Sequence, residues 1–193
     1  MKKLTLICLI LCAVPAFAQT SQVGILFGGS ARLYDQREKK LRTDLPDGFD
    51  LGNSVREIWY GFDIEPDTQL RIKAGEITGP VGGVVAPPAS DPKGNALRDG
   101  RIEHLDFIVD YRFDETFGST GLFAGAGYYR QRSGLTDPAT QKLESDYGFS
   151  VGANGDFPIN RRYGVIIEGA YHWVNFSYKP RFITVTGGLR IRL

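Results

Sequence analysis

The sequence predicts an all-β fold, an eight-stranded antiparallel up-and-down transmembrane β-barrel. Between Val23 and Leu193, hydrophobic residues alternate with small, polar or charged residues in eight separate stretches. A strand with lipid on one side and a polar lumen on the other requires this period of two, because successive side chains point to opposite faces. The connections between the first seven stretches are alternately long and short, as the loops and turns at the two ends of such a barrel are.

The N-terminal residues predict a secretory signal peptide over residues 1–18. Met1-Lys2-Lys3 is basic, 4–14 is an apolar run, and Ala16-Phe17-Ala18 is a small-x-small cleavage site. The alternative is a retained transmembrane helix, which needs about 20 apolar residues, whereas Pro15 interrupts this run. We therefore expect residues 19–193 to form the mature protein, a single outer-membrane β-barrel domain.

The composition of the mature chain excludes several kinds of site. Both cysteines, Cys8 and Cys12, lie in the signal peptide, so no disulfide and no thiolate site is expected after cleavage. Lys2 and Lys3 are also removed, which leaves 21 of the 23 basic residues against 22 acidic residues and a formal net charge of −1. A chain without a basic surplus is not expected to bind nucleic acid.

The first three strands are predicted at residues 23–35, 55–64 and 69–78. Each has one hydrophobic face, which we assign to lipid, and one small or charged face, which we assign to the lumen. The residues assigned to the lumen are Gly24, Gly28, Ser30, Arg32, Glu57, Gly61, Asp63, Arg71, Lys73 and Gly75. Trp59 shares the parity of Glu57 and is therefore also expected inside.

The fourth strand, residues 104–113, has the clearest alternation. Leu105, Phe107 and Val109 interleave with Asp106 and Asp110, and Arg112 continues the charged series. Two acids and a base on one face cannot all be placed in lipid, because isolated charges there are costly. The charged face of this strand must therefore line the lumen.

The remaining strands are predicted at residues 120–131, 146–154, 165–173 and 183–193. The fifth is rich in glycine, and its two faces cannot be distinguished by pattern. The other three alternate, and their residues assigned to the lumen are Gly148, Ser150, Gly152, Asn154, Glu168, His172, Thr184, Thr186, Gly188, Arg190 and Arg192.

The connections differ in length at the two ends of the predicted barrel. Short turns are expected at 65–68, 114–119 and 155–162, and longer loops at 36–54, 79–100 and 132–145. In outer-membrane barrels the short turns are periplasmic and the long loops extracellular. Both termini are therefore expected in the periplasm.

The chain resembles the OmpA/OmpX-type family of small eight-stranded outer-membrane barrels over nearly all of the mature sequence. The resemblance rests on the strand count, the loop parity, the glycine-aromatic stretch Phe123-Ala124-Gly125-Ala126-Gly127-Tyr128, the turn Phe157-Pro158-Ile159-Asn160 and the apolar final strand. It implies a location in the bacterial outer membrane, with outer-membrane lipid, periplasmic chaperones and the barrel-assembly machinery as partners, and a monomer.

Charges of both signs are expected inside the barrel in nearly equal number. They are Arg32, Glu57, Asp63, Arg71, Lys73, Asp106, Asp110, Arg112, Glu168, Arg190 and Arg192. Buried ions persist only when they are paired, and an eight-stranded barrel is just wide enough for side chains to fill it. We predict an ion-pair network that plugs the lumen; the alternative is a narrow porin-like channel lined by the same groups.

Two features could suggest an enzyme, and for both we favour a structural interpretation. Gly148-Phe149-Ser150-Val151-Gly152 matches the nucleophile motif of hydrolases, but that motif needs a sharp strand-to-helix turn, whereas Ser150 is expected in mid-strand. His172 could act as a base in an outer-leaflet lipid hydrolase, because a register with Asn154 opposite Gly164 would place Asp146 across from it. We predict no enzyme activity, no catalytic residue, no cofactor and no metal site.

The function predicted from the sequence is a structural or surface-interaction role in the outer membrane. The charged and Pro-rich long loops are the place where a surface ligand would bind, although the sequence names none. A lipid-modifying enzyme and a narrow channel remain alternatives, as does a soluble lipocalin-like barrel with its faces inverted.

The turn between strands two and three gives the sharpest structural prediction. A three-residue loop Pro66-Asp67-Thr68 keeps Ile64 and Leu70 on the lipid face and puts Asp63 directly across from Arg71. We therefore predict an Asp63–Arg71 ion pair near the periplasmic end.

Overall fold

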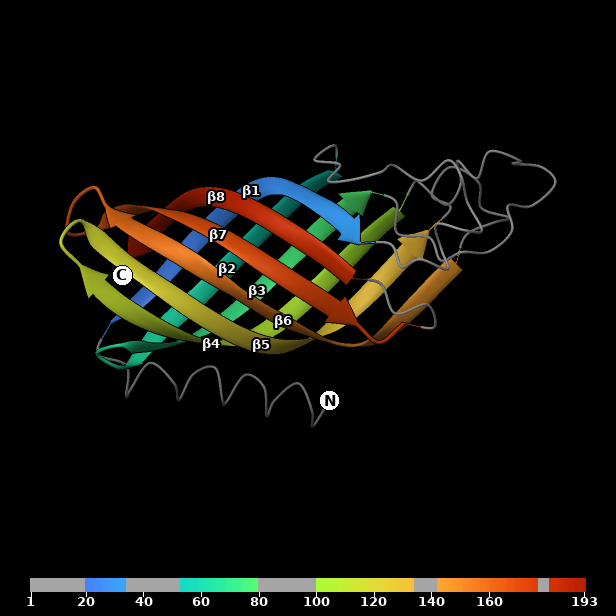
Figure 1. Ribbon diagram of the computed structural model, residues 1–193, viewed down its shortest axis with the longest axis horizontal. Helices are drawn as coiled ribbons and strands as arrows, with labels where there is room; N and C mark the ends of the chain where they lie inside the picture. Colours follow the sequence, from blue (N-terminus) through green and yellow to red (C-terminus); the bar gives the residue numbers. More distant parts are fainter. Residues whose placement is uncertain (1–19, 34–52, 80–99, 134–141, 177–180) are drawn as a thin grey trace.

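The computed structural model describes residues 20–33, 53–79, 100–133, 142–176 and 181–193. These residues form a closed antiparallel barrel of eight strands in sequence order, as predicted (Figure 1). The strands are β1 Ser21–Leu33, β2 Asn53–Glu65, β3 Thr68–Gly79, β4 Gly100–Glu115, β5 Gly118–Ser133, β6 Lys142–Pro158, β7 Tyr163–Val174 and β8 Arg181–Arg192. Most strands extend a few residues beyond their predicted bounds.

The barrel closes because β1 pairs with both β2 and β8. Gly24 is the Cα partner of Trp59 on β2 and of Arg190 on β8. Near the chain end, the Leu193 backbone N–H donates to the Ser21 carbonyl at 2.8 Å. The sheet of the described residues therefore has no open edge that would need a partner strand.

The connections at one end of the barrel, on the left in Figure 1, are short. The strand ends that connect to residues 34–52, 80–99 and 134–141 lie at the opposite end. The short turns span residues 66–67, 116–117 and 159–162. We call this end the turn end and the opposite one the loop end. The predicted signal peptide and most of the predicted long loops lie outside the described residues.

Side chains alternate between the two faces of the wall as predicted. On β4, Phe107 and Val109 are more than half exposed on the outside, whereas Asp106 and Asp110 are at most 2% exposed inside. Charged residues thus cluster in the lumen while an apolar surface faces outward. No helix among the described residues has the length and hydrophobicity needed to cross a bilayer.

The two faces of β5, which the pattern could not assign, are distinct in the structure. Phe123, Tyr129 and Gln131 are buried inside, whereas Leu122 and Tyr128 are exposed outside. The outward face also carries Ala124 and Ala126, which the pattern could not distinguish from the small residues inside. Weak contrast in side-chain size and polarity explains why the sequence left this strand open.

The predicted register between β2 and β3 is wrong by two residues. Asp63 faces Gln69 and Arg71 faces Gly61, with an irregular step in the ladder between Asp63 and Glu65. The extra residue of this bulge, Ile64, lets a two-residue turn close the hairpin while the side chains beyond it keep their faces. The Asp63–Arg71 ion pair is therefore absent, and both residues have other partners.

The predicted register between β6 and β7 is also wrong. Asn154 is opposite Glu168 rather than Gly164, and His172 is opposite Ser150 rather than Asp146. β6 continues to Pro158, so Asp156, which was expected in a turn, lies on the strand and is buried. The longer strand shifts the pairing by four residues, which again preserves the faces.

Gly24 provides the space that Trp59 occupies in the lumen. A Cβ atom at Gly24 would lie 2.4 Å from the Trp59 indole nitrogen, and Trp59 is only 2% exposed. The expected lumen position of Trp59 thus depends on a glycine on the neighbouring strand.

Replacing Gly24 by alanine is expected to destabilise the barrel by about 1–3 kcal/mol, because the added methyl group overpacks the lumen against the indole. The measurement is the free energy of unfolding in urea. The double variant Gly24→Ala/Trp59→Leu should recover part of the loss; equal costs for Gly24→Ala with and without Trp59 would contradict the proposed packing.

Candidate functional site

The centre of the lumen contains a group of five charged side chains, which we call the central ion cluster: Glu57, Arg71, Lys73, Asp110 and Glu168. Glu168 accepts hydrogen bonds from Arg71 Nη1 at 2.8 Å and from Lys73 Nζ. Lys73 Nζ also lies 3.5 Å from Glu57 Oε1, and Arg71 Nε lies 3.4 Å from Asp110 Oδ2. The charged side chains are at most 3% exposed, so the two cations and three carboxylates interact with one another rather than with bulk water.

Aromatic rings form part of the wall around the central cations. The Arg71 guanidinium lies 4.9 Å from the centroid of the Phe123 ring and 5.6 Å from that of Trp59. Lys73 Nζ lies 5.4 Å from the Phe123 centroid. These distances allow cation–π attraction, which adds to the ion pairs at the narrow centre of the barrel.

Towards the loop end, two histidines continue the polar network. His104 lies between two carboxylates, with Nε2 3.3 Å from Glu57 Oε1 and Nδ1 3.0 Å from Asp106 Oδ2. Its ring stacks on Tyr129 at a centroid distance of 5.6 Å. His172 joins the same layer, because its Nδ1 is 3.0 Å from the Tyr129 hydroxyl and its Nε2 is 3.2 Å from Thr184 Oγ1.

Towards the loop end the barrel also contains a cluster of buried apolar side chains, which was not predicted from the sequence. We call this group the apolar cap; it comprises Val55, Ile77, Ile102, Tyr129, Val174, Phe176 and Phe182. All of them are at most 2% exposed. The signal was present in the sequence, because the inward positions near the loop ends of β2, β3 and β4 are aliphatic rather than charged.

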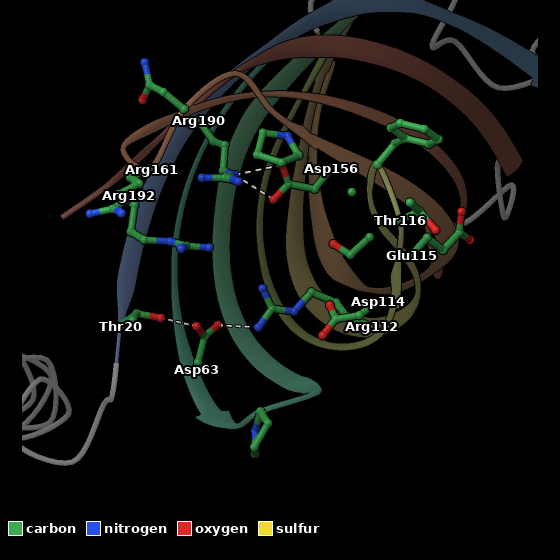
Figure 2. A pocket seen from close by; sticks show the side chains of 16 residues that line it. Thr20, Asp63, Arg112, Asp114, Glu115, Thr116, Asp156, Arg161, Arg190 and Arg192 are labelled. Carbon is green, nitrogen blue, oxygen red and sulfur yellow. Dashed lines mark hydrogen bonds and ion pairs between the residues drawn. The ribbon is translucent and has the colours of Figure 1, made fainter.

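The turn end, in contrast, opens into a polar pocket of about 930 Å³ (Figure 2). Two ion pairs form its walls: Arg112 Nη2 donates to Asp63 Oδ1 at 2.6 Å, and Arg190 Nε donates to Asp156 at 2.6 and 2.8 Å. Asp63 also accepts hydrogen bonds from Gln69 at 2.9 Å and from Thr20. Both ion pairs therefore line the pocket at the turn end.

Most of the charges assigned to the lumen lie in this network, although not always with the expected partner. Arg32 is buried near the loop end of β1, whereas Arg192 is exposed at the mouth of the turn-end pocket. No ion pair among the described residues includes Arg192, because β8 ends there and the wall no longer surrounds it. Asp156, the partner of Arg190, was not among the predicted lumen charges, because its neighbours Gly155 and Pro158 resemble a turn.

Both enzyme candidates, Ser150 and His172, are buried inside the barrel. Ser150 is in mid-strand on β6, as expected, and it is 1% exposed. His172 is fully buried between Tyr129 and Thr184, while Asp146 lies elsewhere and accepts a hydrogen bond from Asn175 at 3.3 Å. The expected His172–Asp146 pair is therefore wrong. Among the described residues, no group of three or more His, Cys, Asp or Glu side chains is arranged to hold a metal ion.

Comparison with solved structures places the barrel in a known fold. Neisserial surface protein A (NspA) matches with a TM-score of 0.59 and 13% identity over 89% of this chain and 95% of its own. Ail, the attachment invasion locus protein of Yersinia pestis, matches with a TM-score of 0.54 and 15% identity over 90% and 98%. The chain has the fold of the small outer-membrane β-barrels.

A third barrel of this fold is the N-terminal domain of OprF from Pseudomonas aeruginosa, with a TM-score of 0.50 and 14% identity over 91% of this chain and 99% of that domain. No family model and no curated protein matches the sequence. Identities of 13–15% extend over nearly the whole length of each partner, so the agreement lies in the arrangement of the strands.

Proposed function

We propose that the protein is an integral outer-membrane barrel with a structural or surface-interaction role and a lumen that does not conduct. The central ion cluster carries this proposal, because it spans the lumen from β3 to β7 with side chains that are at most 3% exposed. An ion crossing the barrel would have to separate these pairs in a medium of low dielectric constant.

The outer face supports the membrane location. Large hydrophobic side chains are about half exposed on β1, β2, β4, β6 and β8; they include Ile25, Phe27, Ile58, Phe107, Val109, Phe149, Val151, Val185 and Leu189. Such a continuous apolar surface would drive aggregation in water, whereas a bilayer would cover it. This supports the membrane barrel over the lipocalin-like alternative, whose apolar residues would face inward.

The orientation we propose is based on the different lengths of the connections at the two ends of the barrel. Short turns at 66–67, 116–117 and 159–162 are periplasmic in this proposal, and residues 34–52, 80–99 and 134–141 are extracellular. The partners we propose are outer-membrane lipid and, during biogenesis, periplasmic chaperones and the barrel-assembly machinery. We propose a monomer without enzymatic activity, because the lumen histidines and Ser150 are buried away from substrate.

Fractionation of cells that express the protein tests the location. Recovery in the outer-membrane fraction, with extraction only by detergent, is expected from the exposed apolar surface. Recovery in the soluble periplasmic fraction without detergent would refute the proposal.

A surface-interaction role is the more specific candidate within this proposal. One neighbour of the same fold is named for attachment and invasion, and a structure of it contains a heparin analogue, sucrose octasulfate. Adhesion of cells that express the full chain or a variant lacking residues 34–52 and 80–99 tests the role. Equal adhesion by the two strains would leave only the structural role.

A further inference from the structure

Charged side chains occur on the outside of the barrel at the loop end of β2–β5, where the apolar surface stops. We call this group the arginine patch: Arg56, Glu76, Arg101, Glu103, Arg130 and Arg132. The patch contains four arginines and two glutamates, and each strand continues towards the turn end with an outward residue of the apolar belt: Ile58, Ala74, Leu105 or Tyr128.

Strand pairing places the patch residues side by side. Arg56 is opposite Glu76, Glu76 is opposite Glu103, and Glu103 is opposite Arg130. In the adjacent outward row, Arg101 is opposite Arg132. The described outward positions at the same end of β6 and β7 carry no charge, and β8 carries Arg181 there, next to Leu33 and Trp173 and separate from the patch.

The two glutamates orient the arginines without neutralising them all. Arg101 Nη1 donates to Glu76 at 3.0 Å, and Arg130 Nε donates to Glu103 at 2.7 Å. Arg132 Nη2 lies 3.9 Å from Glu103 Oε1. The side chains of Arg101, Arg130 and Arg132 remain 36–42% exposed. Guanidinium groups that are held in place and still accessible suit bidentate binding of phosphate.

An apolar groove of about 390 Å³ runs directly below Arg56 and Glu76. It is lined by Ile25, Phe27, Ile58 and Ala74, where the small side chain of Ala74 leaves a hollow between larger neighbours. A groove with this lining fits a hydrocarbon chain, and the charges at its head fit an anionic group. The two features are continuous on the same face.

We propose that this face binds one phosphate-bearing lipid of the outer leaflet, with its phosphates on the arginine patch and one acyl chain in the groove. The inference rests on the proposed membrane location, since the patch would then lie at the level of the lipid headgroups. A surplus of two positive charges complements a phosphorylated headgroup and would not select a zwitterionic one.

Lipid binding to the purified full chain in detergent tests the proposal, with bound lipid counted by native mass spectrometry. The probes are diphosphorylated lipid A, phosphatidylcholine and inorganic phosphate. We expect one molecule of lipid A to bind tightly and phosphatidylcholine to bind more weakly. The variant Arg101→Gln/Arg130→Gln should bind lipid A about 25-fold more weakly, given the contribution of each arginine near an anionic headgroup.

A matched control removes the same charge at the turn end. Arg161 and Arg192 are both exposed there, and Arg161→Gln/Arg192→Gln should leave lipid A binding unchanged. Ala74→Leu, which fills the groove, should weaken lipid A binding without creating a preference for phosphatidylcholine. Every variant is compared after its barrel is verified by circular dichroism.

Several outcomes would overturn the inference. They are equal affinity for lipid A and phosphatidylcholine, equal losses in the two double variants, or displacement of lipid A by millimolar inorganic phosphate, which would indicate an unspecific anion site. If one of these outcomes is found while the protein still requires detergent for extraction, the lipid site is refuted and the membrane proposal is not affected. Solubility without detergent would instead refute the membrane proposal itself.

Discussion

Replacing Glu168 by glutamine is expected to cost about 3 kcal/mol of barrel stability. Glu168 accepts hydrogen bonds from both Arg71 and Lys73, and its side chain is 1% exposed. Glutamine preserves the shape but removes the charge, so each cation keeps only its longer contact, Arg71 with Asp110 at 3.4 Å and Lys73 with Glu57 at 3.5 Å. Removing one partner of a buried pair is strongly destabilising, because the two desolvated cations lose the carboxylate to which both donate.

The loss of stability is measured as the change in the free energy of unfolding in urea, with the protein in lipid vesicles. Glu103→Gln is the matched control, because Glu103 is paired with Arg130 on the outside, where its side chain is 28% exposed. Exposed pairs contribute about 0–1 kcal/mol. Similar losses in the two variants would show that the central ion cluster does not hold the barrel together.

Replacing Phe182 by alanine is expected to cost about 3–5 kcal/mol, because it removes a ring from the apolar cap. Phe182 is 2% exposed and packs with Val55, Ile77, Ile102 and Phe176. The surrounding strands are tied into the closed sheet, so they cannot collapse into the space that the ring leaves.

The same unfolding experiment tests this effect, with Phe117→Ala as control. Phe117 lies in the turn between β4 and β5 and is 86% exposed, so its loss should change stability by less than about 0.5 kcal/mol. A Phe182→Ala barrel as stable as the unaltered protein would mean that the cap is loosely packed.

The hydrophobic pattern predicted the strands and their faces but not how far each strand slides along its neighbour. Both register errors, two residues at Asp63 and four at His172, are even numbers. A slide by an even number leaves every side chain on its own face, so the alternation contains no information about it. The Ile64 bulge adds a residue to one strand only, which no regular pattern can reveal.

The partners of the lumen charges depend on those registers and on contacts across the barrel. Arg71 and Glu168 are 97 residues apart and meet because β3 and β7 face each other through the lumen. The sequence indicated that both side chains must be inside the barrel and paired, but it did not identify the partner of either. Trp59 is similar, because the space for it comes from Gly24 on the neighbouring strand.

Single-channel recording in planar bilayers tests the central claim, a closed lumen, most directly. With the central ion cluster and the apolar cap in place, the purified full-length protein should show no steady conductance steps at moderate voltage. Glu168→Gln/Phe182→Ala, which weakens both barriers, should conduct at least intermittently if it still inserts. Large, stable and reproducible steps from the unaltered protein would contradict the closed lumen and favour the narrow channel.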